Sequence, residues 1–147
     1  MASVLGSGLD YRVKVRGRGF SMIPFIKDND AVMLRPVDHQ RGIKFGDVVA
    51  VSGGDEGKIV IHRVIRSKKG RYQTKGDSNL RADAWCTIDN IVGRVDAVIA
   101  GECQDDRCIP NHYKQWQNVI IAIASKTGFL NRILYPGYLY LRNLVKR

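Results

Sequence analysis

Short segments rich in valine and isoleucine recur between residues 11 and 101, and Gly, Asp or Asn bounds most of them. Such runs are typical of β-strands, because branched side chains pack well on a pleated surface and the bounding residues favour turns. We expect strands over residues 11–18, 31–37, 47–53, 58–65, 71–77 and 90–101. The pattern therefore predicts a mainly β domain over residues 1–110, and 147 residues with 44% hydrophobic content suit a globular core.

The pattern changes after the polar loop at residues 101–111. The next segment carries apolar side chains at helical spacing: Trp116, Val119, Ile120 and Ile123. Residues 129–147 mix Leu, Ile and Tyr with Arg and Lys, and neither segment reaches the roughly twenty uninterrupted apolar residues of a spanning helix. We expect residues 111–147, with a helix over 113–126, to form a basic amphipathic helical extension. It either packs on the β core or lies on a membrane surface.

The positive charge is concentrated at the C-terminal end. The chain carries a net charge of +10, and from Arg107 onward it has seven Lys or Arg residues and no Asp or Glu. This block indicates an anionic partner, and the lack of an aromatic-rich nucleic-acid signature favours anionic lipid over nucleic acid. On a membrane, aromatic residues would lie at the headgroups and basic residues would meet lipid. These are Trp116, Tyr135, Tyr138 and Tyr140, and Lys126, Arg132, Arg142, Lys146 and Arg147.

Three cysteines, Cys86, Cys103 and Cys108, do not make a complete disulfide framework and favour a reducing compartment. Cys103 and Cys108 with His112 form a weak zinc pattern, since the spacing is unusual and a fourth ligand is missing. We therefore expect no metal and no cofactor. The first ten residues are too short and too polar for a signal peptide or a membrane span. The expected location is cytoplasmic or peripheral to a membrane rather than secreted.

Ser21 lies in the segment GFSMIP, between a glycine and a proline. A serine hydroxyl is a weak nucleophile until a neighbouring base takes its proton. Of the three histidines, only His62 lies inside an apolar strand, where it shares a face with two valines. A mostly buried imidazole suits a general base near neutral pH, but a histidine held in the core by a backbone carbonyl fits the same position.

The segment TKGDSNLRAD, residues 74–83, supplies two carboxylates in a turn after another strand. Asp77 and Asp83 are both candidates to hold an imidazole in the tautomer that a base requires. Ser, His and Asp then occur in the order Ser21, His62, Asp83. These residue types are candidates for a nucleophile, a base and an orienting carboxylate, although a serine in this position is also typical of a simple turn.

Five motifs, GFSMIP, FGDVVAV, IHRVI, TKGDSNLRAD and GRV, follow one another over residues 13–97. They closely resemble the successive boxes of type I signal peptidases, in the branch of the endoplasmic reticulum, archaea and some sporulating bacteria, where histidine replaces lysine as the base. The resemblance implies a β fold of coiled antiparallel sheets, like that of the repressor autoproteases, and no cofactor. It also implies cleavage of a leader or signal segment from a precursor peptide or protein.

The resemblance assigns a role to each residue of the predicted site. Ser21 matches the nucleophile, His62 the general base and Asp83 the carboxylate of the triad. Asp77 matches the other acidic position of the same box and is expected to support the site structurally. Substrate would bind as an extended strand, with small side chains at the first and third positions before the cut.

Gly19, Met22 and Pro24 surround the predicted nucleophile. Gly19 would permit a close approach or an unusual dihedral, and Pro24 would fix the exit of the turn, leaving Ser21 at a strand end. Met22 and Pro24 are expected to shape the cleft together with residues 31–35. The Ser21 N–H is the expected oxyanion donor. Members commonly carry a serine where Gly19 stands, and losing such a donor costs about a hundredfold to a thousandfold in rate unless another amide substitutes.

A further departure concerns the segment before the first box, and other functions stay open. Members carry a transmembrane segment before the first box, so this chain resembles a short form that acts in the cytoplasm or is anchored by its basic C-terminal region. A catalytically weak or silent peptide-binding module is one alternative, and an autoproteolytic repressor is a second, weaker one because His62 stands where that group has lysine. The basic strand face (Arg12, Lys14, Arg16 and Arg18) would attract an acidic peptide or simply be solvated.

Overall fold

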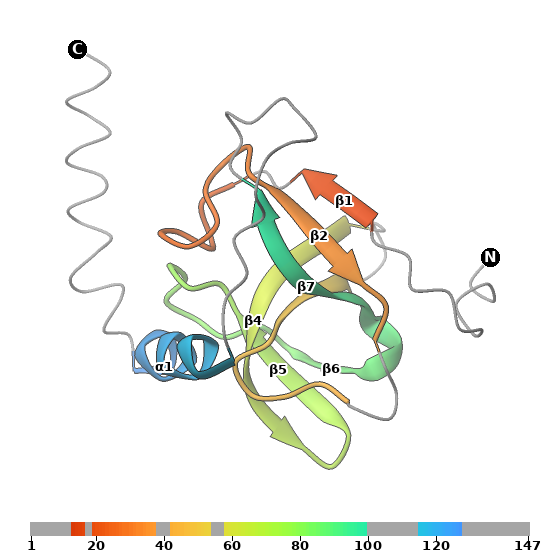
Figure 1. The fold of residues 1–147 in the computed structure, drawn as a ribbon. Coiled ribbons are helices and arrows are strands. Elements are labelled where there is room, and N and C mark those ends of the chain that lie inside the picture. Colours follow the sequence, from red (N-terminus) through yellow and green to blue (C-terminus); the bar gives the residue numbers. More distant parts are fainter. Residues whose placement is uncertain (1–12, 17–18, 38–41, 54–57, 100–114, 128–147) are drawn as a thin grey trace.

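The computed structural model describes residues 13–16, 19–37, 42–53, 58–99 and 115–127, and all structural statements refer to these. They form one antiparallel sheet of seven strands and an α-helix that lies beside it (Figure 1). The elements are β1 (Val13–Arg16), β2 (Ala31–Arg35), β3 (Val48–Gly53), β4 (Lys58–Lys68), β5 (Arg71–Lys75), β6 (Trp85–Thr87), a 3-10 turn (Ile88–Asn90), β7 (Ile91–Ile99) and α1 (Gln115–Lys126).

The prediction of a mainly β chain with a C-terminal helix is confirmed. Each segment expected as a strand contains one, and the helix expected over 113–126 is α1. Strand β6 was not predicted. It is a three-residue edge strand with Trp85 and Thr87 exposed, and it contains no valine or isoleucine that would indicate a strand. Strand β4 also runs three residues beyond the predicted end, to Lys68, since its hairpin partner β5 continues the pairing.

Strand β4 changes its partners along its length. The sheet order is β1-β2-β7-β3-β4-β5-β6. Residues Lys58 to Arg63 pair with β3, whereas pairing with β5 covers Arg63 to Lys68. The β4–β5 hairpin closes through Lys69 and Gly70, whose φ values of 48° and 72° suit the two-residue turn that matches strand twist. His62 and Arg63 thus lie where β4 passes from one partner to the next.

Each face of the sheet carries its own apolar cluster. Successive side chains of a strand point to opposite faces, and β3 therefore contributes alternate residues to the two clusters. The first contains Met22, Ile26, Val32, Leu34, Val48, Ala50 and Val98, and the second contains Ile43, Val49, Val51, Val64, Tyr72 and Ile91. In the register, His62 is opposite Val49 and Arg63 is opposite Val48. The two neighbours consequently emerge on opposite faces of the sheet.

Helix α1 packs against β4 with a small and partly polar face. Ile121, Ala122 and Ser125 are buried, whereas Ile120 and Ile123 are 57% and 53% exposed. The helix is therefore in contact with the β core, yet two isoleucines of its predicted apolar stripe face away from it. No helix in the described part of the chain is long and apolar enough to cross a membrane. The second amphipathic segment, residues 129–147, lies outside the described residues.

Candidate active site

Ser21 lies in the turn between β1 and β2, not at the end of a strand. The Met22 carbonyl accepts hydrogen bonds from the amides of Phe25 and Ile26, both at 3.0 Å, which closes the turn just after the serine. Gly19 has a φ of +112°, and its N–H donates to Asp28 Oδ1 at 2.8 Å. No atom beyond its two chain neighbours lies within 4 Å of the place where a Cβ would be. The positive φ therefore explains why a glycine stands here, and a close approach of another atom does not.

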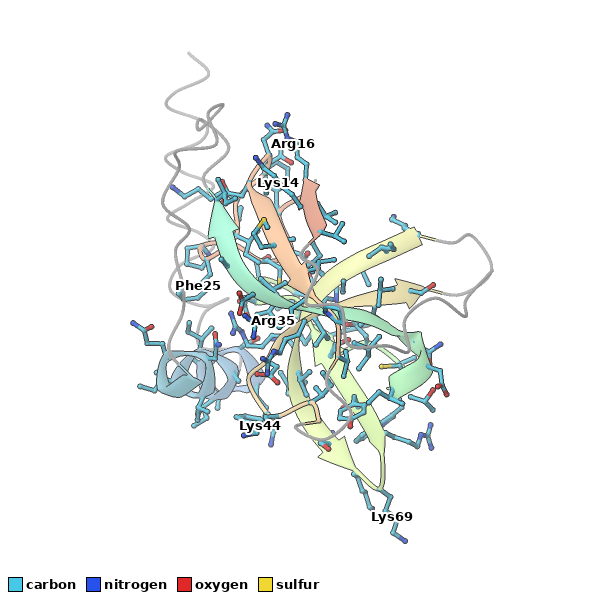
Figure 2. All side chains as sticks on the ribbon, turned by 45° about the vertical axis from the view of Figure 1, so that its right-hand side comes forward. Lys14, Arg16, Phe25, Arg35, Lys44 and Lys69 are labelled. Carbon is cyan, nitrogen blue, oxygen red and sulfur yellow. The ribbon has the colours of Figure 1, made fainter. Side chains whose placement is uncertain are left out.

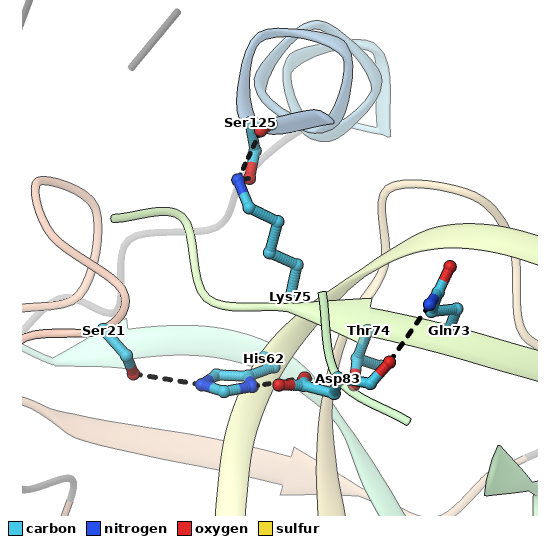
Figure 3. A network of polar contacts seen from close by, with 7 residues as sticks. All are labelled: Ser21, His62, Gln73, Thr74, Lys75, Asp83 and Ser125. Carbon is cyan, nitrogen blue, oxygen red and sulfur yellow. Dashed lines mark hydrogen bonds and ion pairs between the residues drawn. The ribbon is translucent and has the colours of Figure 1, made fainter. Parts of the chain in front are cut away.

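Ser21, His62 and Asp83 form a continuous chain of polar contacts (Figure 3). The imidazole Nε2 lies 3.2 Å from Ser21 Oγ, and Nδ1 lies 2.6 Å from Asp83 Oδ2. His62 is buried in the middle of β4, at 7% exposure. The structure thus brings together three side chains from separate parts of the sequence in the geometry that a nucleophile, a base and an orienting carboxylate require.

Two residues of β5 hold Asp83 in place. Thr74 Oγ1 donates to Asp83 Oδ2 at 2.7 Å, and the Asp83 amide donates to the Thr74 carbonyl at 2.8 Å. Gln73 Nε2 donates to the Asp83 carbonyl at 3.1 Å. Neither residue was predicted to belong to the site, although Thr74 is the first residue of the segment that contains both aspartates.

The charge of Asp83 determines how the imidazole is protonated. Burial alone would raise the pKa of Asp83, but hydrogen bonds from His62 and Thr74, with the His62 charge, outweigh it and hold the pKa below its ordinary value. An ionised carboxylate can only accept hydrogen bonds, so His62 Nδ1 carries the proton that it donates. In the neutral ring Nε2 is then the acceptor for the Ser21 hydroxyl, which is the arrangement a general base needs.

Asp77 does not contact His62; it pairs with Arg63 on the other face of the sheet. Arg63 Nε and Nη2 donate to its two carboxylate oxygens, each at 2.8 Å, and the side chains are 2% and 0% exposed. Burial raises the pKa of Asp77, and the Arg63 guanidinium offsets part of that rise. Of the two predicted carboxylates, Asp83 therefore faces the imidazole and Asp77 is part of the buried framework. The Arg63 pair was not predicted.

The loop after β5 clamps the backbone around Ser21. The Ser78 amide donates to the Ser21 carbonyl at 2.8 Å, and Ser78 Oγ donates to the Phe20 carbonyl at 2.6 Å. A Cβ on Gly76 would lie 2.7 Å from the Ser21 carbonyl oxygen, closer than real Cβ contacts allow. Gly76 and Ser78 therefore position the turn that carries Ser21, and their signal in the sequence was the Gly-Asp-Ser run inside the aspartate segment.

A cleft of about 320 Å³ opens beside Ser21 and His62. Its lining comes from β1, the turn and the first half of β4: Val15, Arg16, Gly19, Ser21, Met22, Ile26, Lys27, Lys58, Ile59, Val60, Ile61 and His62. Met22 lies in the cleft as expected, but the expectation for Pro24 and residues 31–35 is wrong. Strand β2 is an interior strand between β1 and β7, so β1 and not β2 forms the wall. Pro24 follows a cis peptide bond and does not line the cleft.

Helix α1 is attached by polar contacts to the strands that carry the site. The Lys75 ammonium donates to the Ser125 carbonyl near the end of the helix, and Arg63 Nη1 donates to Asn118 Oδ1 at 3.0 Å. Burial lowers the pKa of Lys75, and the nearby Asp77 opposes that shift. Thr74 and Lys75 are neighbours on β5, so one points to Asp83 and the other to α1 (Figure 3). The helix is thus connected to the strands that carry the candidate site residues.

Metal coordination has no support in the described part of the chain. Those residues contain no group of three His, Cys, Asp or Glu side chains that could hold a metal ion. The weak zinc candidates Cys103, Cys108 and His112 lie outside the described residues, and Cys86 is a free thiol.

Neither the family models nor the curated proteins include a match to this chain.

Proposed function

We propose that this chain is a serine endopeptidase of the signal-peptidase type, with Ser21 as nucleophile, His62 as general base and Asp83 as the orienting carboxylate. One observation carries the proposal: Ser21 Oγ, the imidazole and Asp83 Oδ2 are joined at 3.2 and 2.6 Å beside an open cleft. A buried structural histidine needs a partner for one nitrogen, but it does not need a serine hydroxyl facing a cleft on the other. The substrate is a precursor peptide or protein from which a leader or signal segment is removed.

The contacts account for each proton transfer. Ser21 Oγ attacks the carbonyl carbon of the scissile peptide bond while its proton moves to His62 Nε2. Asp83 stabilises the imidazolium, and the tetrahedral intermediate then breaks its C–N bond as Nε2 protonates the leaving amine. Water attacks the acyl-Ser21 ester in the same way, which releases the second product and restores the hydroxyl.

The tetrahedral intermediate also needs a donor for its oxyanion. The Ser21 N–H has no hydrogen-bond acceptor among the residues that the structure describes, so it is available to the intermediate. Gly19 lacks the hydroxyl that family members commonly place there. We expect a slower enzyme than one with two donors, by about a hundredfold or more.

The exposed isoleucines of α1 support peripheral attachment to an anionic membrane. Ile120 and Ile123 lie one turn apart and face away from the sheet, and Lys126 follows them as an exposed cation. Liposomes containing anionic lipid should sediment the protein at low salt and less of it at high salt. Replacing both isoleucines by aspartate should weaken sedimentation, while Val92→Asp, at an exposed position of the interior strand β7, should not. Absence of binding at both salt concentrations would contradict the attachment.

Cleavage of a diverse peptide library, analysed by mass spectrometry, tests the endopeptidase directly. The wild-type protein is compared with Ser21→Ala, His62→Ala and the control Ser67→Ala. Ser67 is an exposed serine on β4, the strand that carries His62. We expect cuts that are present in the wild type and the control and lost in the two site variants. Cuts that persist in both site variants would contradict the proposal. No cuts at all would favour the silent peptide-binding module.

A further inference from the structure

The cleft beside Ser21 is flanked by two strand edges that no described strand covers. Strand β1 is at the end of the sheet and pairs only with β2. In β4, residues Lys58 to His62 pair with β3 on one side, but β5 begins its pairing only at Arg63. Both edges border the cleft. An extended peptide can therefore hydrogen-bond to either strand as it passes Ser21.

The charged side chains along this path are cations. Arg16, Lys27 and Lys58 line the cleft, and no Asp or Glu of the described residues does so. Asp28 is close to Lys27 in the sequence, but its Oδ1 accepts the Gly19 N–H. Neither Arg16 nor Lys58 forms an ion pair within the described ranges. As far as the described residues show, one cation on β1 and one on β4 are thus available to a bound anion.

The position of Lys58 relates it to the scissile bond. Lys58 precedes His62 by four residues, and the alternation of a strand places both side chains on the same face of β4. At about 3.3 Å per residue, the two Cα atoms are roughly 13 Å apart. A peptide that lies beside β4 with its scissile bond near His62 would bring a residue about four positions from the cut to Lys58.

We propose that the cleft selects substrates with an acidic side chain about four residues from the scissile bond, bound by Lys58 with Arg16 on β1. The selectivity rests on the proposed peptidase function and adds a specificity determinant to it. Both cations are exposed, and each such contact is worth a few-fold in rate at low salt. We expect a Glu peptide to be cleaved about fivefold to tenfold faster than its Gln counterpart, with the difference shrinking as salt screens it.

A glutamate scan of one cleaved peptide tests this directly. Glu, Gln or Lys is placed at each position from five residues before to five residues after the cut, and kcat/KM is measured for the wild type, Lys58→Glu and Lys69→Glu. Lys69 is a matched control, because it is an exposed lysine at the tip of the β4–β5 turn, at the opposite end of the molecule from Arg16 (Figure 2). The same peptides, or variants of one bound peptide if none is cleaved, are fluorescently labelled and titrated into Ser21→Ala and into Ser21→Ala with Lys58→Glu to measure binding without cleavage.

The expected result is one position, three to five residues from the cut, at which Glu is preferred. That preference should change to Lys in Lys58→Glu and persist in Lys69→Glu. Cleavage without any such preference, or with one that Lys58→Glu leaves unchanged, would overturn the selectivity while leaving the peptidase function intact. If the wild type cleaves nothing, the peptidase function fails and the titrations decide the selectivity. Tighter binding of Glu peptides that is lost with Lys58→Glu would support it, and equal binding of Glu and Gln peptides would overturn it.

Discussion

Two neighbouring residues of β4 each hold an aspartate, but the two pairs lie on opposite faces of the sheet and differ in their access to solvent. His62 and Asp83 are 9% and 32% exposed in their side chains and meet Ser21 at the cleft. Arg63 and Asp77 are 2% and 0% exposed and meet no solvent. The same kind of contact between a carboxylate and a nitrogen-bearing side chain thus occurs once beside the cleft and once in the enclosed interior.

The number of partners differs as well. Asp83 is held by Thr74 and Gln73, and the imidazole keeps one nitrogen for the serine. Arg63 instead uses its donors on Asp77, the Gly46 carbonyl and Asn118, and it lies 5.8 Å from the centre of the Phe25 ring. Buried donors that find hydrogen-bond acceptors stabilise a fold. General base catalysis instead requires a nitrogen or oxygen that is free to accept a proton. We infer that the first pair serves chemistry and the second holds the surrounding segments together.

Replacing one aspartate at a time should separate the two pairs most strongly. Asp83→Asn removes the acceptor that sets the imidazole tautomer, and kcat/KM should fall by up to about 10⁴-fold with little change in the unfolding transition. Asp77→Asn should reduce stability and leave the activity per folded molecule within about tenfold of wild type. Peptide cleavage and circular dichroism on the same samples measure both. Equal activity losses in the two variants would break the distinction.

Removing the arginine should test the structural pair. Arg63→Met leaves the Asp77 carboxylate buried without its partner, which should lower the free energy of unfolding by about 3–5 kcal/mol. The double variant Arg63→Met with Asp77→Leu removes both charges and should recover much of that loss. Urea unfolding of the wild type, Arg63→Met, Asp77→Leu and the double variant measures the effect. A double variant less stable than either single variant would show that the ion pair itself contributes large net stability.

Two glycines allow a smaller test of the contact between the framework and α1. Gly46 has a φ of +92°, and a Cβ there would lie 2.9 Å from the backbone of Asn118. Gly70 has a φ of +72°, but no atom beyond its chain neighbours lies within 4 Å of the place where its Cβ would be. Gly46→Ala should cost about 1–3 kcal/mol from strain and overpacking, and Gly70→Ala about 1 kcal/mol from strain alone. Equal losses in urea unfolding would mean that the helix contact at Gly46 is not tight.

The lowered pKa of Asp83 should leave a small pH signature. The pKa is lower in the folded protein than the ordinary value of about 3.9, so the ionised group stabilises the fold at higher pH. That contribution is lost as the pH falls through the ordinary value and then through the folded one. The difference in unfolding temperature between wild type and Asp83→Asn should therefore be present at pH 7 and shrink below pH 4. A difference that grows toward acid would contradict the sign of the shift.

The strands were predictable because valine and isoleucine recur with turn residues between them. The assembly of Ser21, His62 and Asp83 could be anticipated only from the order of the motifs, since their spacing in sequence gives no distance. The Arg63 and Asp77 pair left no signal, because one arginine beside a histidine has no periodic pattern. The cleft walls were misplaced because strand order is set by long-range pairing.

The orientation of α1 shows a further limit. Two isoleucines of its predicted apolar stripe are exposed, and the helix turns other residues toward the sheet, where Asn118 and Ser125 accept hydrogen bonds from Arg63 and Lys75. Buried donors on the strands therefore contribute to the orientation of the helix in addition to its buried apolar side chains. A pattern based on helical spacing contains no information on those distant donors.

We propose that Ser21 and His62 act as one catalytic unit, which a double-mutant cycle on peptide cleavage can test. Rates with one cleaved peptide are measured for the wild type, Ser21→Ala, His62→Ala and the double variant. Groups that work together lose nearly everything with the first substitution, about 10⁶-fold in the best-studied case of such a site. We predict that the double variant is no slower than the slower single variant. Losses that multiply, or a single variant that keeps the wild-type rate, would contradict the claim.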